Sequence, residues 1–145
     1  MDNRFTFLDK IAKVFYDLQL PYKLLVLKND KGFSSKYLTL INDKLTMTDI
    51  KKYSDESKIL LDICRKKQVG LSFRIFESLG CHKKIITTNK DIINYDFYNP
   101  SNIFVIDEEN VVIDTSFIES NYLDIPNHIY DKYTIKGWLD TINQE

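Results

Sequence analysis

The pattern of hydrophobic and polar positions predicts a strand–helix–strand unit at the centre of the chain. Ser57–Ile63 contains a nearly continuous apolar run, which is typical of a parallel strand covered on both faces, and Lys83–Thr87 repeats that pattern. Between these strands a basic turn ends at Gly70, and a short helix follows it. That helix begins at the carboxyl end of the first strand, where open α/β sheets bind ligands. Its predicted core face consists of Leu71, Ile75, Phe76 and Leu79.

The same patterning predicts further strands and helices on both sides of this unit. Three more strands are expected at Lys23–Lys28, Leu38–Ile41 and Asn102–Ile106. Helices are expected from Asn3 to about Leu20, after Thr46, over Asp91–Tyr95, and after Thr134. Thr46 and Asp49 have the spacing of a capping box. The predicted fold class is therefore α/β: a Rossmann-like open, mostly parallel sheet with helices on both faces.

The last quarter of the chain has a weaker pattern. We expect residues 115–130 to be irregular around Pro126. The final helix presents an apolar side that should dock on the sheet, with Trp138 in the core; that side consists of Ile135, Trp138, Leu139 and Ile142.

Length and composition narrow the class of protein. The 145 residues are enough for one domain with a sizeable core, and we predict a single domain over 1–145. The net charge of −1 argues against a broad nucleic-acid surface. No apolar run is long enough to span a bilayer, and the start has no signal-peptide pattern, so we expect a cytoplasmic protein that reaches the inner membrane only through partners. Cys64 and Cys81 offer no disulfide framework and are expected to be reduced and buried beside strands.

The basic turn before the central helix has the features of an anion site. Gly70 leaves the backbone open, and the free N–H groups and positive dipole end of a helix favour an anion. Arg65, Lys66 and Lys67 place three cations just ahead of it. Arg74 falls near the first turn, where the helix dipole disfavours a cation by a few tenths of a kcal/mol, up to about 1 kcal/mol. A bound anion would remove that conflict.

Glu77 follows Arg74 by three positions and therefore lies on a similar side of the helix. Its carboxylate is placed to accept hydrogen bonds from two vicinal ribose hydroxyls, as acidic residues do in dinucleotide-binding folds. The alternative is a solvated Arg74–Glu77 ion pair that contributes at most about 0.5 kcal/mol.

These residues form part of a longer string that resembles a known family. The string begins at Leu61 as Leu-Asp-Ile-x-Arg-x-x-Gln-x-Gly-Leu-Ser-Phe-Arg-Ile-Phe-Glu-Ser-Leu-Gly and continues with Lys-Lys-Ile-Ile-Thr-Thr-Asn. From Asp91 it reads Asp-Ile-x-Asn-Tyr-Asp-Phe-Tyr-Asn-Pro-x-Asn-Ile. It resembles the carboxyl-terminal, nucleotide-sugar-binding half of GT-B glycosyltransferases. It is most similar to bacterial enzymes of lipopolysaccharide and capsular polysaccharide synthesis.

The resemblance implies roles for individual residues. The donor diphosphate would be bound by the backbone at Gly70 and Leu71 and by the Ser72 and Arg74 side chains, with Arg65 nearby in the basic turn, and Glu77 would hold the ribose. One position departs from the family pattern. Many members carry an acidic residue eight positions before the ribose glutamate, where it contacts the donor sugar. Val69 stands there instead, and the neighbouring Gln68 is only a weak substitute as the sugar contact.

The resemblance also implies what should accompany this domain. A first, central strand and an acceptor-binding domain that usually supplies the catalytic base would precede the first helix, so we expect a fragment or reduced relative of the two-domain enzyme. Catalytic residues are therefore unknown. The strands at Lys23 and Ser57 should either pair directly or leave sheet edges, and a separate acceptor-binding chain or a homo-oligomer would fill such edges. The predicted partners include no nucleic acid. With no Asp-x-Asp spacing in the chain, we expect no metal or other cofactor.

The predicted function is nucleotide-sugar binding within a glycosyltransferase of bacterial surface polysaccharide synthesis, with little or no transfer by this chain alone. One alternative is a non-catalytic interaction module, or degenerate glycosyltransferase half, that works with a partner chain. A flavodoxin-like or receiver-like domain shares the alternation of strands and helices. Receivers need an acidic cluster at strand ends near the start of the chain, and flavodoxin-type sites need a glycine- or hydroxyl-rich loop after the first strand; neither is present.

Overall fold

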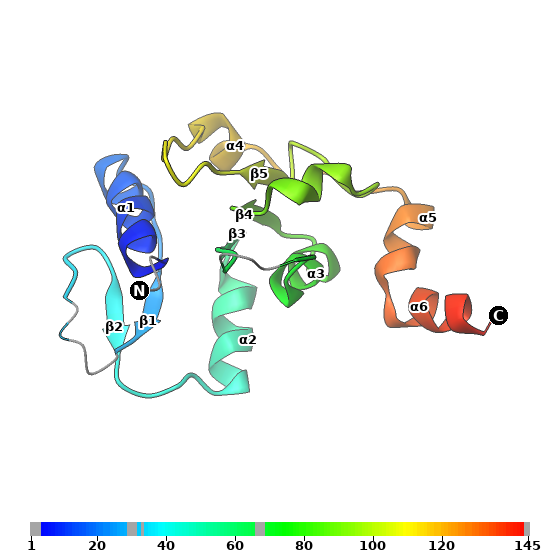
Figure 1. Ribbon diagram of the computed structural model, residues 1–145, viewed down its shortest axis with the longest axis horizontal. Helices are drawn as coiled ribbons and strands as arrows, with labels where there is room; N and C mark the ends of the chain where they lie inside the picture. The colour runs from blue at the N-terminus through cyan, green and yellow to red at the C-terminus, as the bar shows by residue number, and fades with distance from the viewer. Residues whose placement is uncertain (1–3, 29–31, 33, 66–68, 144–145) are drawn as a thin grey trace. The chain divides into compact units, whose positions relative to one another are not determined.

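The structure is a computed structural model, and it describes residues 4–28, 32, 34–65 and 69–143 (Figure 1). The chain packs as two compact units, which we describe separately. Unit 1 comprises Met1–Glu56 with Asp107–Ile113, and unit 2 comprises Ser57–Ile106 with Asp114–Glu145. The assignment of the whole chain to one donor-binding domain stays a prediction.

Unit 1 combines two helices with a two-stranded parallel sheet. Strands β1 (Leu25–Leu27) and β2 (Thr39–Ile41) pair in parallel, and helix α1 (Arg4–Asp17) packs on them through a core of Ala12, Val26 and Leu38. Helix α2 (Met47–Glu56) begins with the predicted capping box. The Thr46 N–H donates to Asp49 Oδ2 at 3.0 Å, and the Asp49 N–H donates to Thr46 Oγ1 at 3.1 Å.

Unit 2 is built on a parallel sheet of order β3-β4-β5 (Figure 1). Its strands are β3 (Ile59–Asp62), β4 (Lys84–Thr87) and β5 (Ile103–Val105), with Leu60 opposite Ile85 and Ile85 opposite Ile103. Helix α3 (Phe73–Gly80) and the 3₁₀ helix η1 (Lys90–Asn94) contribute to one core. The buried members of that core are Leu60, Ile75, Leu79, Ile85, Ile92, Phe97 and Ile103. All five predicted strands are therefore present, and the α/β class with short parallel strands in open sheets is confirmed.

The Lys84 side of β4 is covered by the short helix α4 (Thr115–Glu119). The Phe117 ring lies 5.4 Å from the Phe104 ring, centroid to centroid. The buried Lys84 ammonium donates to the carbonyl oxygens of Phe117 and Ser120 and to Ser120 Oγ, the last two at 2.8 Å. Burial lowers the pKa of Lys84. The prediction of an irregular segment over 115–130 was wrong, because this segment contains α4 and, beyond it, α5 (Asn127–Tyr130).

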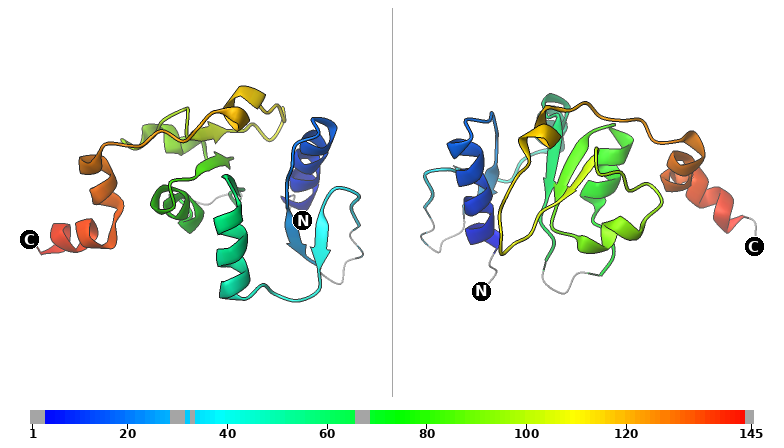
Figure 2. Two further views of the ribbon diagram at one scale, coloured as in Figure 1. Left: turned by 180° about the vertical axis from the view of Figure 1, so that it is seen from behind. Right: turned by 90° about the horizontal axis from the view of Figure 1, so that it is seen from above.

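The chain continues through the 3₁₀ helix η2 (Asp131–Tyr133) into α6 (Ile135–Ile142). The predicted cap is present, since the Gly137 N–H donates to Thr134 Oγ1 at 3.0 Å. The predicted docking of α6 was wrong: its four apolar side chains are exposed, from 46% for Leu139 to 81% for Ile135. Figures 1 and 2 show α6 beyond α5 and away from the strands of its unit. Tyr133 and earlier residues of the segment pack against the core instead.

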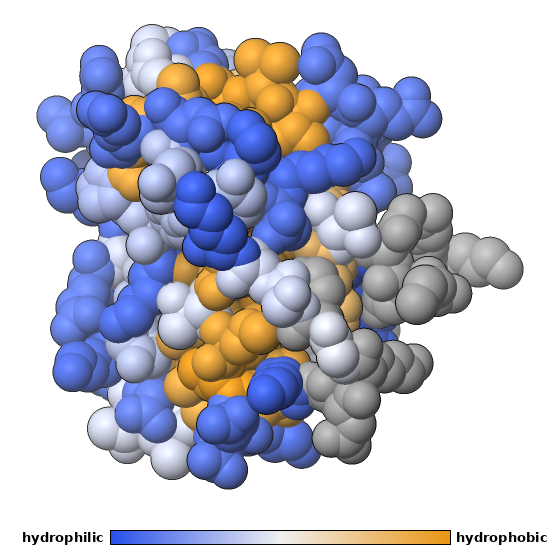
Figure 3. Space-filling view, turned by 90° about the vertical axis from the view of Figure 1, so that its left-hand side faces the viewer, coloured by the Kyte–Doolittle hydropathy of each residue, from blue (hydrophilic) through white to orange (hydrophobic). Residues whose placement is uncertain are grey.

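Sheet edges remain in both units as far as the structure describes them. Strand β1 pairs with β2 and β3 pairs with β4, and no sixth strand occurs among the described residues. Filling of these edges by a partner chain stays a prediction. In the described part of the chain no helix is long and apolar enough to cross a membrane. On the face drawn in Figure 3, hydrophilic side chains surround smaller areas of hydrophobic ones.

Candidate functional site

Polar side chains gather where β3 and β4 end and α3 begins. Asp62 is the last residue of β3, and its carboxylate is buried, with 7% of the residue exposed. Ser72 Oγ donates to Asp62 Oδ1 at 2.7 Å, and Thr87 Oγ1, at the end of β4, donates to Asp62 Oδ2 at 2.8 Å. The Cys64 thiol adds a weaker contact of 3.6 Å to Asp62 Oδ2. A buried carboxylate needs such donors, because burial without them is strongly unfavourable.

Helix α3 starts later than the sequence indicated. Its first residue is Phe73, with Ser72 at the N-cap position, so Gly70 lies three residues ahead of the helix and does not open it. Ser72 has the extended backbone of an N-cap, but its side chain makes no capping hydrogen bond. No hydrogen bond of the described residues uses the backbone N–H groups of residues 70 to 74 as donors. These N–H groups therefore have no acceptor among the described residues, and free N–H groups at the start of a helix favour an anion.

Gly70 adopts a backbone conformation that favours glycine. Its φ is +83°, and a Cβ added there would meet no atom within 4 Å. Its carbonyl oxygen accepts a hydrogen bond from Asn89 Nδ2 at 3.1 Å. Asn89 also caps η1, since its Oδ1 accepts from the Asp91 N–H at 3.0 Å. The loop before α3 is thus attached to the loop that follows β4.

Arg74 and Glu77 form the ion pair that the sequence offered as the alternative to phosphate and ribose binding; their ligand roles stay a prediction. Arg74 Nε lies 3.7 Å from Glu77 Oε2, and the two side chains are 44% and 18% exposed. Arg74 is the second residue of α3, and the first turn contains no acidic residue. The conflict between the guanidinium and the helix dipole therefore persists at this position. Leu71, between Gly70 and Ser72, packs against the core of unit 2.

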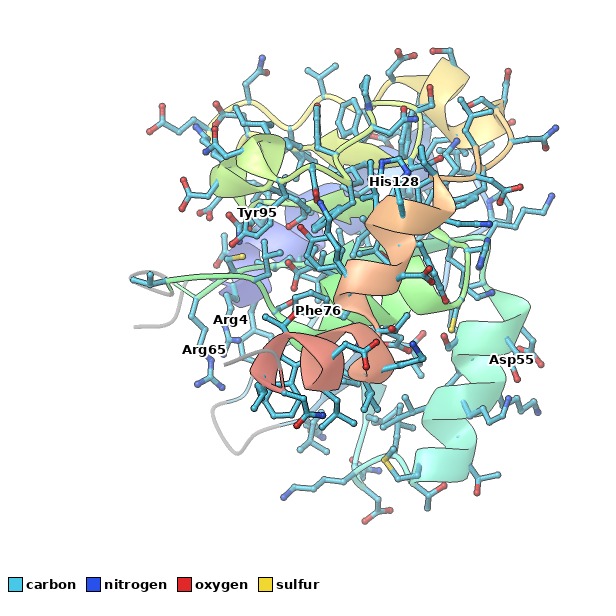
Figure 4. The ribbon with its side chains drawn as sticks, turned by 90° about the vertical axis from the view of Figure 1, so that its right-hand side faces the viewer. Arg4, Asp55, Arg65, Phe76, Tyr95 and His128 are labelled. Carbon is cyan, nitrogen blue, oxygen red and sulfur yellow. The ribbon has the colours of Figure 1, made fainter. Side chains whose placement is uncertain are left out.

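The basic turn is described only in part. Figure 4 shows the Arg65 side chain extending from the loop that follows β3, and Arg65 is exposed. Lys66 and Lys67, together with the predicted sugar contact Gln68, lie outside the described residues. Val69, at the position that departs from the family pattern, is exposed.

Sequence reasoning missed four polar residues of this site, namely Asp62, Thr87, Thr88 and Asn89. All four are buried. A signal for them was present: polar side chains come directly at the ends of two apolar strands. Because the carboxyl ends of parallel strands meet at one edge of a sheet, such residues come together there.

The cysteines and histidines occupy different environments. The Cys64 N–H donates to Thr88 Oγ1 at 2.9 Å, and burial, followed by the Asp62 charge, raises the pKa of the Cys64 thiol. Cys81 is exposed, so its predicted burial was wrong; both cysteines are free. His82 is exposed, and its Nδ1 lies 3.2 Å from Asp124 Oδ1. His128, labelled in Figure 4, is exposed on α5.

A pocket of about 200 Å³ lies between α3 and the carboxyl-terminal segment. Phe76 lines it instead of entering the core as predicted, and Figure 4 shows this residue on α3 near the α5–α6 segment. Tyr133 is fixed at the pocket by a 2.6 Å hydrogen bond to Asp96 Oδ1. Burial, followed by this bond, raises the pKa of Tyr133 to about 12. The full lining is Phe76, Leu79, Gly80, Ile125, Tyr130, Tyr133, Thr134 and Ile135.

No family model matches the chain, and no curated protein or solved structure matches it. The resemblance to GT-B glycosyltransferases therefore stays a prediction that depends on the quoted residues. Within the described ranges, no group of three or more His, Cys, Asp and Glu side chains could hold a metal ion. The expected lack of a cofactor likewise stays a prediction.

Proposed function

We propose that this chain binds a nucleoside diphosphate at the start of α3, either as the free diphosphate or as part of a nucleotide sugar. We further propose that it does so as the donor-binding part of a glycosyltransferase of bacterial surface polysaccharide synthesis. The observation that carries the proposal is the run of backbone N–H groups from residue 70 to 74 that no described residue uses. Ser72, within the run, is hydrogen-bonded to Asp62 at the carboxyl end of the parallel strand β3, and such strand ends are where α/β sheets bind ligands.

The Arg74–Glu77 pair supports the same ligand class. A diphosphate at the N–H groups would pair with the Arg74 guanidinium and remove its conflict with the helix dipole. Glu77 lies one turn further along α3, where a ribose attached to that diphosphate would present two hydroxyls. Donors fixed in this way would stabilise the leaving diphosphate in glycosyl transfer without reorganisation.

Isothermal titration calorimetry with UDP, GDP, CDP, ADP and a panel of nucleotide sugars tests the proposal. We expect heat with at least one diphosphate. Arg74→Ala should weaken its binding by about 10- to 100-fold, because hydrogen bonds to charged groups contribute about 1.5–3 kcal/mol. Glu77→Ala should weaken the binding of nucleotides and leave the affinity for inorganic pyrophosphate unchanged, since pyrophosphate has no ribose.

Lys136→Ala is the matched control for the arginine variant. It also removes a helical cation paired with a carboxylate, since Lys136 Nζ lies 2.9 Å from Asp140 Oδ2, but this pair is on α6. We expect wild-type affinity from this variant. If none of the nucleotides gives heat with a folded protein, or if Lys136→Ala weakens binding as much as Arg74→Ala, the proposed site is wrong.

A second candidate function is a non-catalytic interaction module, and the exposed apolar side of α6 favours it. Arg74→Ala and Glu77→Ala separate the two functions. On the module hypothesis both variants keep the association with a partner chain, whereas Trp138→Ala and Leu139→Ala weaken it. On the nucleotide hypothesis the first two variants lose ligand binding.

A further inference from the structure

We propose that Asp62 is the positioning residue of the diphosphate site. This inference rests on the proposed function and concerns how the start of α3 is held open to the ligand. The buried carboxylate joins three elements, because it belongs to β3 and accepts hydrogen bonds from Ser72 before α3 and from Thr87 of β4. The segment Gly70–Ser72 lies between these attachments.

The first attachment occupies the Ser72 hydroxyl. A serine hydroxyl has one proton, and here it is donated to Asp62 Oδ1 at 2.7 Å. The hydroxyl makes no capping bond to the N–H groups of α3, which therefore stay open. In this arrangement Ser72 contributes no proton to a bound phosphate. Its role is to position the backbone and not to contact the ligand as the family resemblance implied.

The second attachment reaches the other end of the segment. Thr87 Oγ1 donates to Asp62 Oδ2 at 2.8 Å and accepts from the Asn89 N–H at 3.1 Å. Asn89 Nδ2 in turn donates to the Gly70 carbonyl at 3.1 Å. One buried carboxylate thus holds Ser72 directly and Gly70 through two residues. The N–H groups between them are fixed before any ligand arrives, which lowers the cost of ordering the loop on binding.

Because Asp62 is an acidic residue, the inference can be tested by whether Asp62→Asn strengthens or weakens the binding of a diphosphate. A carboxylate near a bound diphosphate repels it, so Asp62→Asn would strengthen binding if charge were its only influence. If Asp62 acts by positioning, the same substitution weakens binding. The Ser72 and Thr87 hydroxyls donate to different carboxylate oxygens, whereas an amide has one acceptor oxygen and a nitrogen that only donates.

Calorimetry with inorganic pyrophosphate and with UDP separates these cases. We expect Asp62→Asn and Ser72→Ala each to weaken pyrophosphate binding about 10-fold. The double variant should bind little more weakly than either single variant, because both substitutions remove the same Ser72–Asp62 hydrogen bond. Ser72→Thr, which keeps the hydroxyl, should restore binding. Ser78→Ala is the matched control: it removes a buried hydroxyl of the same helix that donates to the Ile75 carbonyl at 2.8 Å, and it should leave the affinity within twofold.

Backbone order parameters of residues 70 to 74 in the ligand-free protein provide a second readout. We expect values near those of rigid backbone in the wild type and Ser78→Ala, and a decrease in Asp62→Asn and Ser72→Ala. Wild-type or tighter binding by Asp62→Asn, or additive effects in the double variant, would overturn the inference. If the wild type binds neither ligand, the proposed function fails. In that case the order parameters alone test the positioning role, and unchanged values in both Asp62→Asn and Ser72→Ala overturn it as well.

Discussion

Gly70 is the residue whose backbone conformation determines how the chain enters α3. Its φ of +83° lies where a side chain is disfavoured, although the space around it is open. A substitution there is therefore expected to act through backbone strain and not through a clash. Gly80, at the end of the same helix, also has open space and has no positive φ. The two glycines form a natural comparison.

We predict that Gly70→Ala lowers the free energy of unfolding by about 1–2 kcal/mol, the usual penalty for a side chain in left-handed backbone. Gly70→Asn should lower it less, because asparagine tolerates this region better. Gly80→Ala should have no effect or stabilise by up to about 1 kcal/mol, since alanine favours the helix. Urea denaturation measures all three. Equal losses from the two alanine variants would show that strain at Gly70 is not the cause.

At the scale of the elements, the sequence predicted a strand or helix correctly where residues within the segment itself determine its structure. The apolar runs identified β3 and β4, and the reciprocal Thr46–Asp49 bonds fix the start of α2 within four residues. Helix α4 had no such signal. It has five residues and is held by Lys84, which lies more than 30 positions earlier in the chain. Contacts of that range cannot be deduced from local spacing.

Helix α6 shows a different limit of sequence reasoning. Its amphipathic spacing correctly predicted a helix with one apolar side, but spacing does not say what covers that side. Ile125, Ile129 and Tyr133, earlier in the same segment, pack against the core that α6 was expected to cover. The apolar side of α6 is consequently exposed.

We predict that Trp138 behaves as a surface residue. It is 61% exposed and is the only tryptophan of the chain, so intrinsic fluorescence reports on it alone. Its emission should be that of a water-exposed indole and should be quenched by iodide. Trp138→Ser should change the free energy of unfolding by no more than about 0.5 kcal/mol, whereas a buried tryptophan would lose about 3–5 kcal/mol.

Phe97→Ala is the control for this prediction, because Phe97 is only 1% exposed and belongs to the core of unit 2. This variant should lose about 3–5 kcal/mol. Blue-shifted, unquenched emission from Trp138, or a loss from Trp138→Ser comparable to that from Phe97→Ala, would mean that α6 is docked after all.

At the scale of the whole molecule, the candidate site divides into a part visible in the sequence and a part created by folding. Arg74 and Glu77 belong to one helix, and their spacing alone predicted their proximity. Asp62 and Thr87 are 25 positions apart, and they meet because the parallel register places them opposite each other. The sequence marked both strands but not their register, so the buried connection was not predicted.

The dependence of stability on acid pH is also a property of the whole molecule, since carboxylates in both units contribute to it. Hydrogen bonds lower the pKa of three aspartates: Asp49 accepts from Thr46, Asp96 from Lys132 and Tyr133, and Asp114 from Ser116. A lowered folded-state pKa means that the unfolded chain binds more protons. The stabilisation is therefore complete above the ordinary aspartate pKa of about 3.9 and is lost as the pH falls through the lower folded-state values.

We predict that the free energy of unfolding, measured by urea denaturation at a series of pH values, decreases steadily below about pH 4. Asp96→Asn should remove part of this decrease, because an amide does not titrate; the variant should differ most from the wild type above pH 4 and approach it as the pH falls. The reason is that protonation deprives the wild type of the same two charge-assisted contacts, from the Lys132 ammonium and the Tyr133 hydroxyl, each 2.6 Å from the Asp96 carboxylate. A constant difference between the two proteins across this range would show that the Asp96 charge does not contribute to folding.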